Sequence, residues 1–208
     1  MADTIYLSNV RLSFPKLIEA STAQDNAAKK FSADLIFVPN DPQLAKFMGE
    51  VNKLATEKWK DHAQAVLGQI QTDRKLRCYG NGAEKVDKKT YKPYTGYDGM
   101  AYVSANSNED RPPQIMRPAD GKVAANQIER TELARNLYGG CFVNVAIRPW
   151  AQDNQFGRAV RCELVAVQFA KDGDAFGEPA PDLSMFGAVA AAPAGPMPAM
   201  PFPSFLGQ

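Results

Sequence analysis

Alternation of apolar and polar side chains with a two-residue period is the strongest pattern in this chain, and it favours a fold built from strands. It is clearest from residue 141 to residue 150. One face there carries Cys141, Val143, Val145 and Ile147, and the other carries Asn144, Arg148 and Trp150. A turn at residues 153–157 then predicts a hairpin. In the return strand the charged Arg161 has the same parity as the apolar Val165. A side chain cannot change to the other face of a strand without a break in the pleat, so we expect a β-bulge near Leu164.

Weaker forms of the same pattern recur along the chain. Strands are predicted at residues 4–14, 30–38, 75–79, 100–105 and 114–117, and helices at residues 41–68 and 127–137. The longer helix begins at Asp41 as N-cap and should end near Gly68. Five or more short strands, one long helix and a curved final hairpin predict a mainly β, α+β fold. A small barrel such as an OB-fold fits this set of elements.

Residues 179–208 are predicted to be a flexible tail, rich in Pro, Ala and Met, that follows a single domain at residues 1–178. Seven of the 15 prolines lie in this tail. Proline lacks a backbone donor and the segment has no apolar periodicity, so it should be disordered or extended. It serves either as an inert tether or as a docking peptide, and Phe202 and Phe205 favour docking.

Charge is unevenly distributed along the chain, although the formal net charge is only +1. Residues 1–171 hold all 24 basic residues and 19 of the 23 acidic ones, which gives this part a charge of +5. The remainder is acidic, with Asp172, Asp174, Glu178 and Asp182. This bias agrees with a polyanionic partner but does not require one.

The composition indicates a cytoplasmic protein without a membrane segment. No apolar run approaches the roughly 20 residues that a membrane-spanning helix needs, and the first residues lack the features of a signal peptide. The cysteines Cys78, Cys141 and Cys162 have neither CxxC nor Cys/His spacing. We therefore expect them to be reduced and structural.

Patterns typical of catalysis are missing from the sequence. His62 is the only histidine, and its place on the predicted helix among apolar neighbours favours a structural role. No GxxxxGK[S/T] or GxGxxG phosphate loop is present. Asp98, Glu109 and Asp110 could hold a metal ion, but solvated loop carboxylates are the better interpretation. We expect no enzymatic activity, no metal and no cofactor.

Basic and aromatic residues interleave between residues 73 and 102, where five of the seven tyrosines lie. Single-stranded nucleic acid needs cations that follow the phosphates and flat rings on which unpaired bases stack. The DNA-binding residues predicted in this region are Arg74, Lys75, Arg77, Tyr79, Lys88, Lys89, Tyr91, Lys92, Tyr94, Tyr97 and Tyr102. Tyr91, Tyr94 and Tyr97, spaced three apart around Pro93 and Gly96, fit a surface loop best. In the alternative interpretation the tyrosines belong to the barrel and the lysines only solubilise the surface.

A second candidate surface lies on the final hairpin. It consists of Arg148 and Trp150 on one strand, with Phe156 and Arg158 across the turn. The alternation places Arg148 and Trp150 on the face opposite the apolar core side chains. An exposed tryptophan there indicates base stacking or an interface.

Several segments of the chain are familiar in order and spacing: Tyr138–Asn144, Trp150–Gly157, Val165–Phe169, Asp172–Gly177 and, near the start, Val10–Pro15. Through these segments the chain resembles the single-stranded DNA-binding proteins of tailed bacteriophages, a family once catalogued as a domain of unknown function. The resemblance implies an OB-fold, a role in phage DNA replication, recombination or repair, and no cofactor. It assigns no DNA contacts to particular residues.

The function expected from these observations is sequence-tolerant binding of single-stranded DNA in the cytoplasm of a phage-infected host cell. The expected partners are single-stranded DNA, replication or recombination proteins recruited through the tail, and further copies of the chain on DNA. Two alternatives stay open. The protein could also bind duplex or anneal strands, or it could be a scaffold-like phage protein that associates with itself through its aromatic residues.

Overall fold

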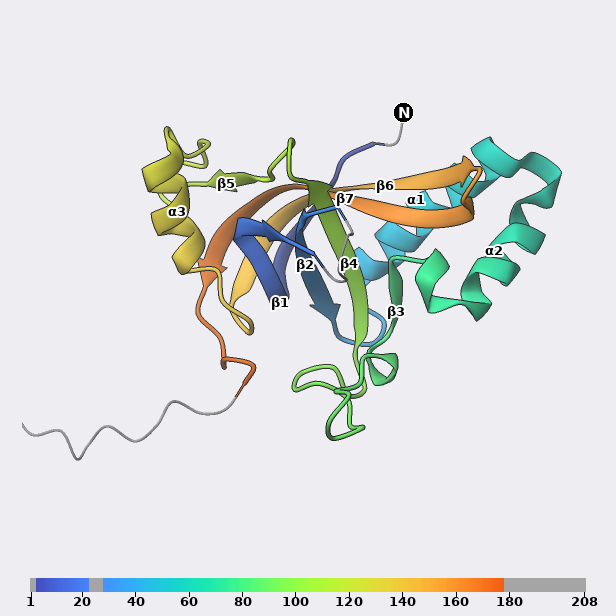
Figure 1. Cartoon of the computed structure of the whole chain (residues 1–208), viewed down its shortest axis with the longest axis horizontal. Helices are drawn as coiled ribbons and strands as arrows, with labels where there is room; N and C mark the ends of the chain where they lie inside the picture. The colour runs from blue at the N-terminus through green and yellow to red at the C-terminus, as the bar shows by residue number, and fades with distance from the viewer. Residues whose placement is uncertain (1–2, 23–27, 178–208) are drawn as a thin grey trace, which may run out of the picture. The chain divides into compact units, whose positions relative to one another are not determined.

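Seven strands and three α-helices make up the fold in the computed structural model, which describes residues 3–22 and 28–177 (Figure 1). The strands are β1 (Ile5–Ser21), β2 (Lys30–Phe37), β3 (Tyr79–Asn81), β4 (Ala101–Asn108), β5 (Gln114–Met116), β6 (Phe142–Asn154) and β7 (Gly157–Lys171). The helices are α1 (Pro42–Trp59), α2 (Ala63–Thr72) and α3 (Gln127–Arg135), with 3₁₀ turns η1 (Lys60–His62), η2 (Arg74–Leu76) and η3 (Gly82–Glu84). The predicted tail, residues 179–208, lies outside the described residues.

The strands form one sheet that closes on itself. Their order is β3-β4-β2-β1-β6-β7-β5, and an additional parallel pairing joins β4 to β7 at Asn106 and Glu163. This pairing completes a ring of five strands, β1-β2-β4-β7-β6, whereas β3 and β5 extend it at either side. The ring is the strand arrangement of an OB-type barrel, with α3 between its third and fourth strands. The predicted mainly β, α+β fold with an OB-like barrel is confirmed.

The interior of the barrel follows the alternation in the sequence. Val143, Val145 and Ile147 of β6 are buried, as predicted. In the pairing of β6 with β7, Ala146 pairs with Ala166 and the next residue, Ile147, pairs with Leu164. Val165 therefore has no partner in β6 and is the extra residue of a bulge. Leu164 is buried in the core, and after the extra residue Val165 the inward-facing positions of β7 shift by one. The β-bulge predicted near Leu164 is therefore confirmed.

The predicted long helix begins as expected but is interrupted. Asp41 caps α1 by accepting a hydrogen bond from the backbone N–H of Gln43 at 2.8 Å. The prediction of one helix up to Gly68 is wrong, because the chain breaks at Lys60 and restarts as α2. Lys60 has a φ of 49° and ψ of −126°, a backbone conformation outside the helical region. The break lets α1 and α2 bury their apolar faces in the same core.

Lys60→Gly should raise the free energy of unfolding by about 1 kcal/mol. A non-glycine residue at this φ and ψ is strained by about 1–3 kcal/mol, and glycine relieves the strain. Glycine also loses more conformational entropy on folding than lysine, but this cost is smaller than the strain relieved. The Lys60 side chain is exposed, so little packing is lost. Urea unfolding measures the change, and Lys58→Gly, inside the last turn of α1, should be destabilising instead.

Other predicted elements need smaller corrections. The strand predicted at residues 75–79 is wrong, because residues 74–76 form η2 and β3 begins only at Tyr79. His62 lies in η1 and is exposed rather than packed among apolar neighbours. Cys78, Cys141 and Cys162 are free and buried, and burial raises the pKa of the Cys141 and Cys162 thiols. Within residues 3–22 and 28–177, no helix has the length and apolar character needed to cross a bilayer.

Candidate nucleic-acid interface

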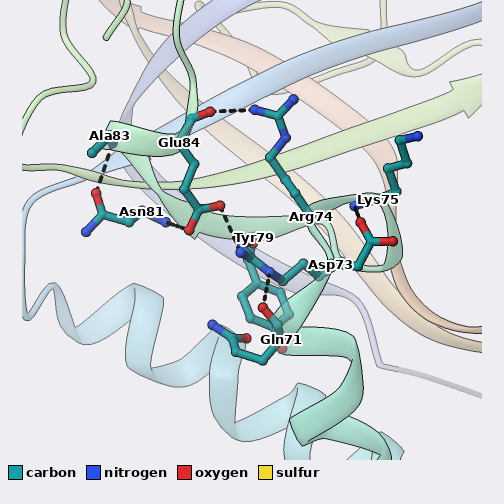
Figure 2. Close-up of polar contacts among 9 residues, drawn as sticks. Gln71, Asp73, Arg74, Lys75, Tyr79, Asn81, Ala83 and Glu84 are labelled. Atoms are coloured by element: carbon teal, nitrogen blue, oxygen red, sulfur yellow. Dashed lines mark hydrogen bonds and ion pairs between the residues drawn. The ribbon is translucent and has the colours of Figure 1, made fainter. Parts of the chain in front are cut away.

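A polar network links residues 71–84, and Figure 2 shows Arg74, Glu84 and their neighbours in it. The Arg77 guanidinium pairs with the Glu84 carboxylate at 2.8 Å and donates to the carbonyls of Gln71 and Tyr79. Its side chain is only 6% exposed. Arg74 donates to the backbone carbonyl of Glu84, which ties η2 to η3. The expectation that Arg77 contacts DNA is corrected, because its guanidinium is already fully engaged in holding this segment together.

Three of the five tyrosines predicted to stack on bases are buried instead. Tyr79 lies in the main core against Phe47, with ring centroids 6.1 Å apart. Tyr97 and Tyr102 form a second, smaller core with Ile36. At 7%, 0% and 2% exposure, Tyr79, Tyr97 and Tyr102 leave too little ring surface for a base to stack on, so the expectation that they stack is corrected. Tyr97, one of the residues that the loop spacing favoured most, is the most deeply buried of them at 0% exposure.

The second core is anchored on a buried carboxylate. The Tyr97 hydroxyl donates to Asp34 at 2.6 Å, and the Lys85 ammonium pairs with the same carboxylate at 2.7 Å. The Ser104 hydroxyl donates to its other oxygen. Burial, and then the Asp34 charge, raise the pKa of the Tyr97 phenol, so Tyr97 stays a hydrogen-bond donor at neutral pH. The segment 82–100 therefore folds back over the outer face of β2 and β4.

The tip of this segment remains exposed and basic. Lys88, Lys89 and Lys92 are exposed, and Tyr91 is 83% exposed with a φ of 55°. Asp87 fixes the turn, since its carboxylate accepts from the backbone N–H of Lys89 at 2.6 Å. We call Lys88, Lys89, Tyr91 and Lys92 the loop strip. These four of the predicted residues are placed where a polyanion could reach them.

Tyr94 connects the loop strip to a groove on the barrel. Its ring packs edge-on against Phe14 of β1, with centroids 4.8 Å apart. Phe14 is 46% exposed and lines a groove of about 490 Å³ together with Lys16, Ser21, Thr22, Ala28, Lys30, Ser32 and Asn106. The groove thus has an aromatic wall and two exposed lysines, Lys16 and Lys30. Neither Phe14 nor these lysines were predicted as site residues.

Three residues of this groove, Lys16, Ser32 and Asn106, belong to a row of paired residues that runs around the outside of the barrel. Neighbouring strands pair Lys16 with Ser32, Ser32 with Asn106, Asn106 with Glu163 and Glu163 with Arg148. We call these five residues the barrel row. Paired residues in adjacent strands project from the same face, and the residues next to them in sequence, such as Ala105 and Leu164, point into the core. The barrel row is therefore a continuous polar band across β1, β2, β4, β7 and β6.

The β6–β7 hairpin continues the band and runs alongside α1 (Figure 1). Trp150, 44% exposed, pairs in register with Arg161, so both side chains lie on the Arg148 face. Arg161 donates to the carbonyl of Lys75 at 2.7 Å, which places residue 75 of the first predicted surface beside the second. The structure thus places Lys75 beside Arg161, the residue that pairs with Trp150.

Two residues predicted for the hairpin surface are placed differently. Arg158 pairs in register with Asp153 and forms an ion pair with it at 3.6 Å. Asp153 also accepts from the Trp59 indole N–H at 2.9 Å, so this face of the hairpin is turned towards α1. The grouping of Arg158 with Trp150 is corrected, because the two lie on opposite faces. Phe156 is 77% exposed at the tip of the turn.

Chemically, the surface can bind a flexible polyanion that carries flat rings. Phe14 and Trp150 offer half-exposed aromatic faces near the two ends of the barrel row, and lysines and arginines lie between and beside them. Phosphates are attracted by the cations, and unpaired bases can stack on the rings. Among the described residues no group of three or more His, Cys, Asp or Glu side chains is arranged to hold a metal ion.

Comparison with known proteins identifies the family. A family model described as "Enterobacter phage Enc34, ssDNA-binding protein" matches residues 3–193. This chain belongs to the Enc34 ssDNA-binding protein family. Protein p50 of Acyrthosiphon pisum secondary endosymbiont phage 1 is similar as well, at 32% identity over 175 residues, which cover 83% of this chain and 85% of that protein.

Solved structures of phage proteins share the fold of this Enc34-family chain. The single-stranded DNA-binding protein of bacteriophage Enc34 in complex with ssDNA matches with a TM-score of 0.63 at 23% identity, covering 84% of this chain and 89% of that one. The single-stranded DNA-binding protein gp2.5 of bacteriophage T7 matches with a TM-score of 0.50 at 12% identity, covering 92% and 100% of the two chains. At these identities the likeness concerns the fold.

Sequence reasoning missed the groove of this Enc34-family chain for a definable reason. Phe14 and Lys30 lie at the ends of the strands predicted at residues 4–14 and 30–38, and Lys16 lies just beyond the first of them. None of the three stands in a segment that is rich in both charge and aromatic rings. The signal in the sequence was the Phe14–Pro15 pair, and in the structure Phe14, which lies within β1, has a φ of 45°. Such an outlier at an exposed aromatic residue indicates a local constraint that packing of the core alone does not require.

Proposed function

We propose that this chain binds single-stranded DNA on the outer face of its barrel, with little sequence preference, and coats strands exposed during phage DNA replication, recombination or repair. The observation that carries the proposal is the barrel row, a continuous polar and basic band with half-exposed aromatic rings, Phe14 and Trp150, near its ends. Membership of the Enc34 family, and the Enc34 protein's structure in complex with ssDNA, support it.

The chemistry of the band favours single strands over duplex. Bases in a duplex are stacked on each other, so their faces cannot reach Phe14 or Trp150 without unpairing. A single strand offers both its phosphates and its base faces, and each stacked base contributes about 1–3 kcal/mol. Lys16, Lys30 and Lys75 can follow the phosphates, and the loop strip supplies further cations beside the groove. None of these contacts reads base edges, which supports sequence tolerance.

The proposal describes a binding protein rather than an enzyme, acting in the cytoplasm of the host cell. The surface consists mainly of cations, amides, hydroxyls and aromatic rings, with the single carboxylate of Glu163, and these groups are sufficient for binding. Recruitment of replication or recombination proteins is assigned to residues 179–208, which lie outside the described residues. Strand annealing and duplex binding are the nearest alternatives, and competition by duplex DNA separates them from the main proposal.

Intrinsic fluorescence tests the proposal with a built-in reporter. The two tryptophans differ in exposure, since Trp59 is 5% exposed and Trp150 is 44% exposed. Adding poly(dT) to the full chain should therefore quench emission mainly from Trp150. The log–log salt slope of the affinity should be about −0.7 for each phosphate contact. A signal that depends only on protein concentration would favour the scaffold alternative, and equal affinity for duplex or a flat salt response would count against the proposal.

A further inference from the structure

Glu163 is the only acidic residue of the barrel row, and it lies in the middle of the proposed DNA path. It pairs in register with Asn106 on one side and Arg148 on the other. A carboxylate repels phosphate, so a negative charge at this position opposes the binding that the neighbouring cations favour. The position therefore needs an explanation beyond surface solubility.

The contacts of Glu163 show what its charge does. Its two carboxylate oxygens engage two arginines from different parts of the fold. Oε2 lies 3.0 Å from Nη1 of Arg148 in β6, and Oε1 lies 3.8 Å from Nη1 of Arg111, which follows β4. The Glu163 side chain is 23% exposed and that of Arg111 is 78% exposed. Arg148 is further held by Thr4, whose hydroxyl accepts from Nη2 at 3.3 Å.

This arrangement matches the way arginines hold a phosphate. A carboxylate and a phosphate both present two oxygens to guanidinium N–H groups, and both form charge-assisted hydrogen bonds with arginine. A phosphate arriving between Arg111 and Arg148 would meet the same donors that Glu163 now occupies. The cluster of Glu163 with two arginines carries +1, whereas the two arginines alone would carry +2.

We propose that Glu163 is an internal phosphate mimic, which holds Arg111 and Arg148 ready on the barrel row and must yield them to a phosphate of the bound strand. The inference rests on the proposed function and adds a regulatory element to it. Competition by Glu163 limits affinity, so that a coated strand can be released to other proteins. It also assigns Arg111, a residue outside both surfaces predicted from the sequence, to the DNA path.

The test measures dT-oligomer affinity of the full chain over a series of salt concentrations, for the wild type and for Glu163→Gln. Glutamine keeps the size of the side chain but not its charge. Binding at low salt should tighten by about 5–30-fold, the range expected for removing one repulsive charge near a phosphate. The log–log salt slope should stay close to that of the wild type, because both arginines contact phosphate in the bound complex of either protein.

The matched control is Asp120→Asn, which changes the net charge equally. Asp120 pairs with Arg117 at 3.1 Å in the turn after β5, and neither residue belongs to the barrel row. This variant should change the affinity much less than Glu163→Gln does. If Glu163→Gln binds with unchanged affinity or more weakly than the wild type, or if Asp120→Asn tightens binding equally, the phosphate-mimic proposal is overturned.

A second variant keeps the proposal testable if Glu163→Gln does not fold. Arg111→Gln alters a side chain that is largely exposed and should fold normally. It should weaken binding and make the salt slope shallower by about 0.7, because one phosphate contact is lost. Unchanged binding in this variant would overturn the proposal. Absence of ssDNA binding by the wild type is a different result, since it would remove the proposed function itself.

Discussion

Replacing Tyr97 with alanine should lower the free energy of unfolding by about 3–5 kcal/mol, the range measured for removing a fully buried aromatic ring. Tyr97 is 0% exposed and packs with Ile36 and Tyr102 in the second core. Its loss also removes a hydrogen-bond donor from the buried Asp34 carboxylate. Urea denaturation followed by circular dichroism measures the change.

Two companion variants show whether the effect comes from burial. Tyr97→Phe keeps the ring and removes only the hydroxyl, so it should be destabilised by about 1–3 kcal/mol, less than the alanine variant. Tyr91→Ala removes a ring that is 83% exposed and should stay within about 0.5 kcal/mol of the wild type. Equal stabilities of Tyr97→Ala and Tyr91→Ala would show that the segment 82–100 does not pack on β2 and β4 as described.

The double variant Phe14→Ala/Trp150→Ala should lose about 2–6 kcal/mol of poly(dT) binding free energy. Each ring is proposed to stack one base, and each lost stack weakens binding by about 1–3 kcal/mol. The cations of the barrel row remain, so the salt slope should stay close to that of the wild type. Fluorescence anisotropy of a labelled dT oligomer measures the affinity, because Trp150 is no longer available as a reporter.

The matched control removes two aromatic residues that are highly exposed but lie away from the barrel row, one in the loop strip and one at the hairpin tip. Tyr91 and Phe156 are 83% and 77% exposed. Tyr91→Ala/Phe156→Ala should weaken binding by less than the Phe14/Trp150 pair does. A thermal melt of each double variant confirms that it is folded. If the control pair loses more affinity, the strand follows the loop strip and hairpin tip instead of the barrel row.

The barrel was largely predictable because its strands carry their own periodicity. Inward and outward residues of β6 differ in polarity, and the phase change in β7 indicated the bulge that the structure has at Val165. A change of face within a strand requires an extra residue whatever the surrounding fold is. Local pattern alone therefore determined this part of the architecture.

The break between α1 and α2 could not be predicted in the same way. Apolar residues at Val51, Ala55, Trp59 and Ala63 keep a four-residue spacing straight across Lys60. Periodicity therefore continues although the backbone does not. The break is set by how the two helices share one core, which is a tertiary effect.

The candidate site was predicted in part, because charge and aromatic content are local properties but burial is not. Tyr97 lies between Gly96 and Gly99, which is typical of a loop, yet the loop folds back so that its hydroxyl reaches Asp34, 63 residues away. Conversely, the barrel row arises from the register of five strands. Lys16 and Arg148 belong to the same band only because the barrel closes at Asn106 and Glu163.

Ultraviolet crosslinking of the full chain to a dT oligomer, followed by peptide mass spectrometry, tests the central claim most directly, because it locates the bases on the protein surface. If single-stranded DNA crosses the outer face of the barrel, thymine adducts should form on the peptides that contain Phe14 and Trp150, and excess unlabelled poly(dT) should suppress them. Adducts confined to the peptides of Tyr91 and Phe156, with none at Phe14 or Trp150, would contradict binding along the barrel row.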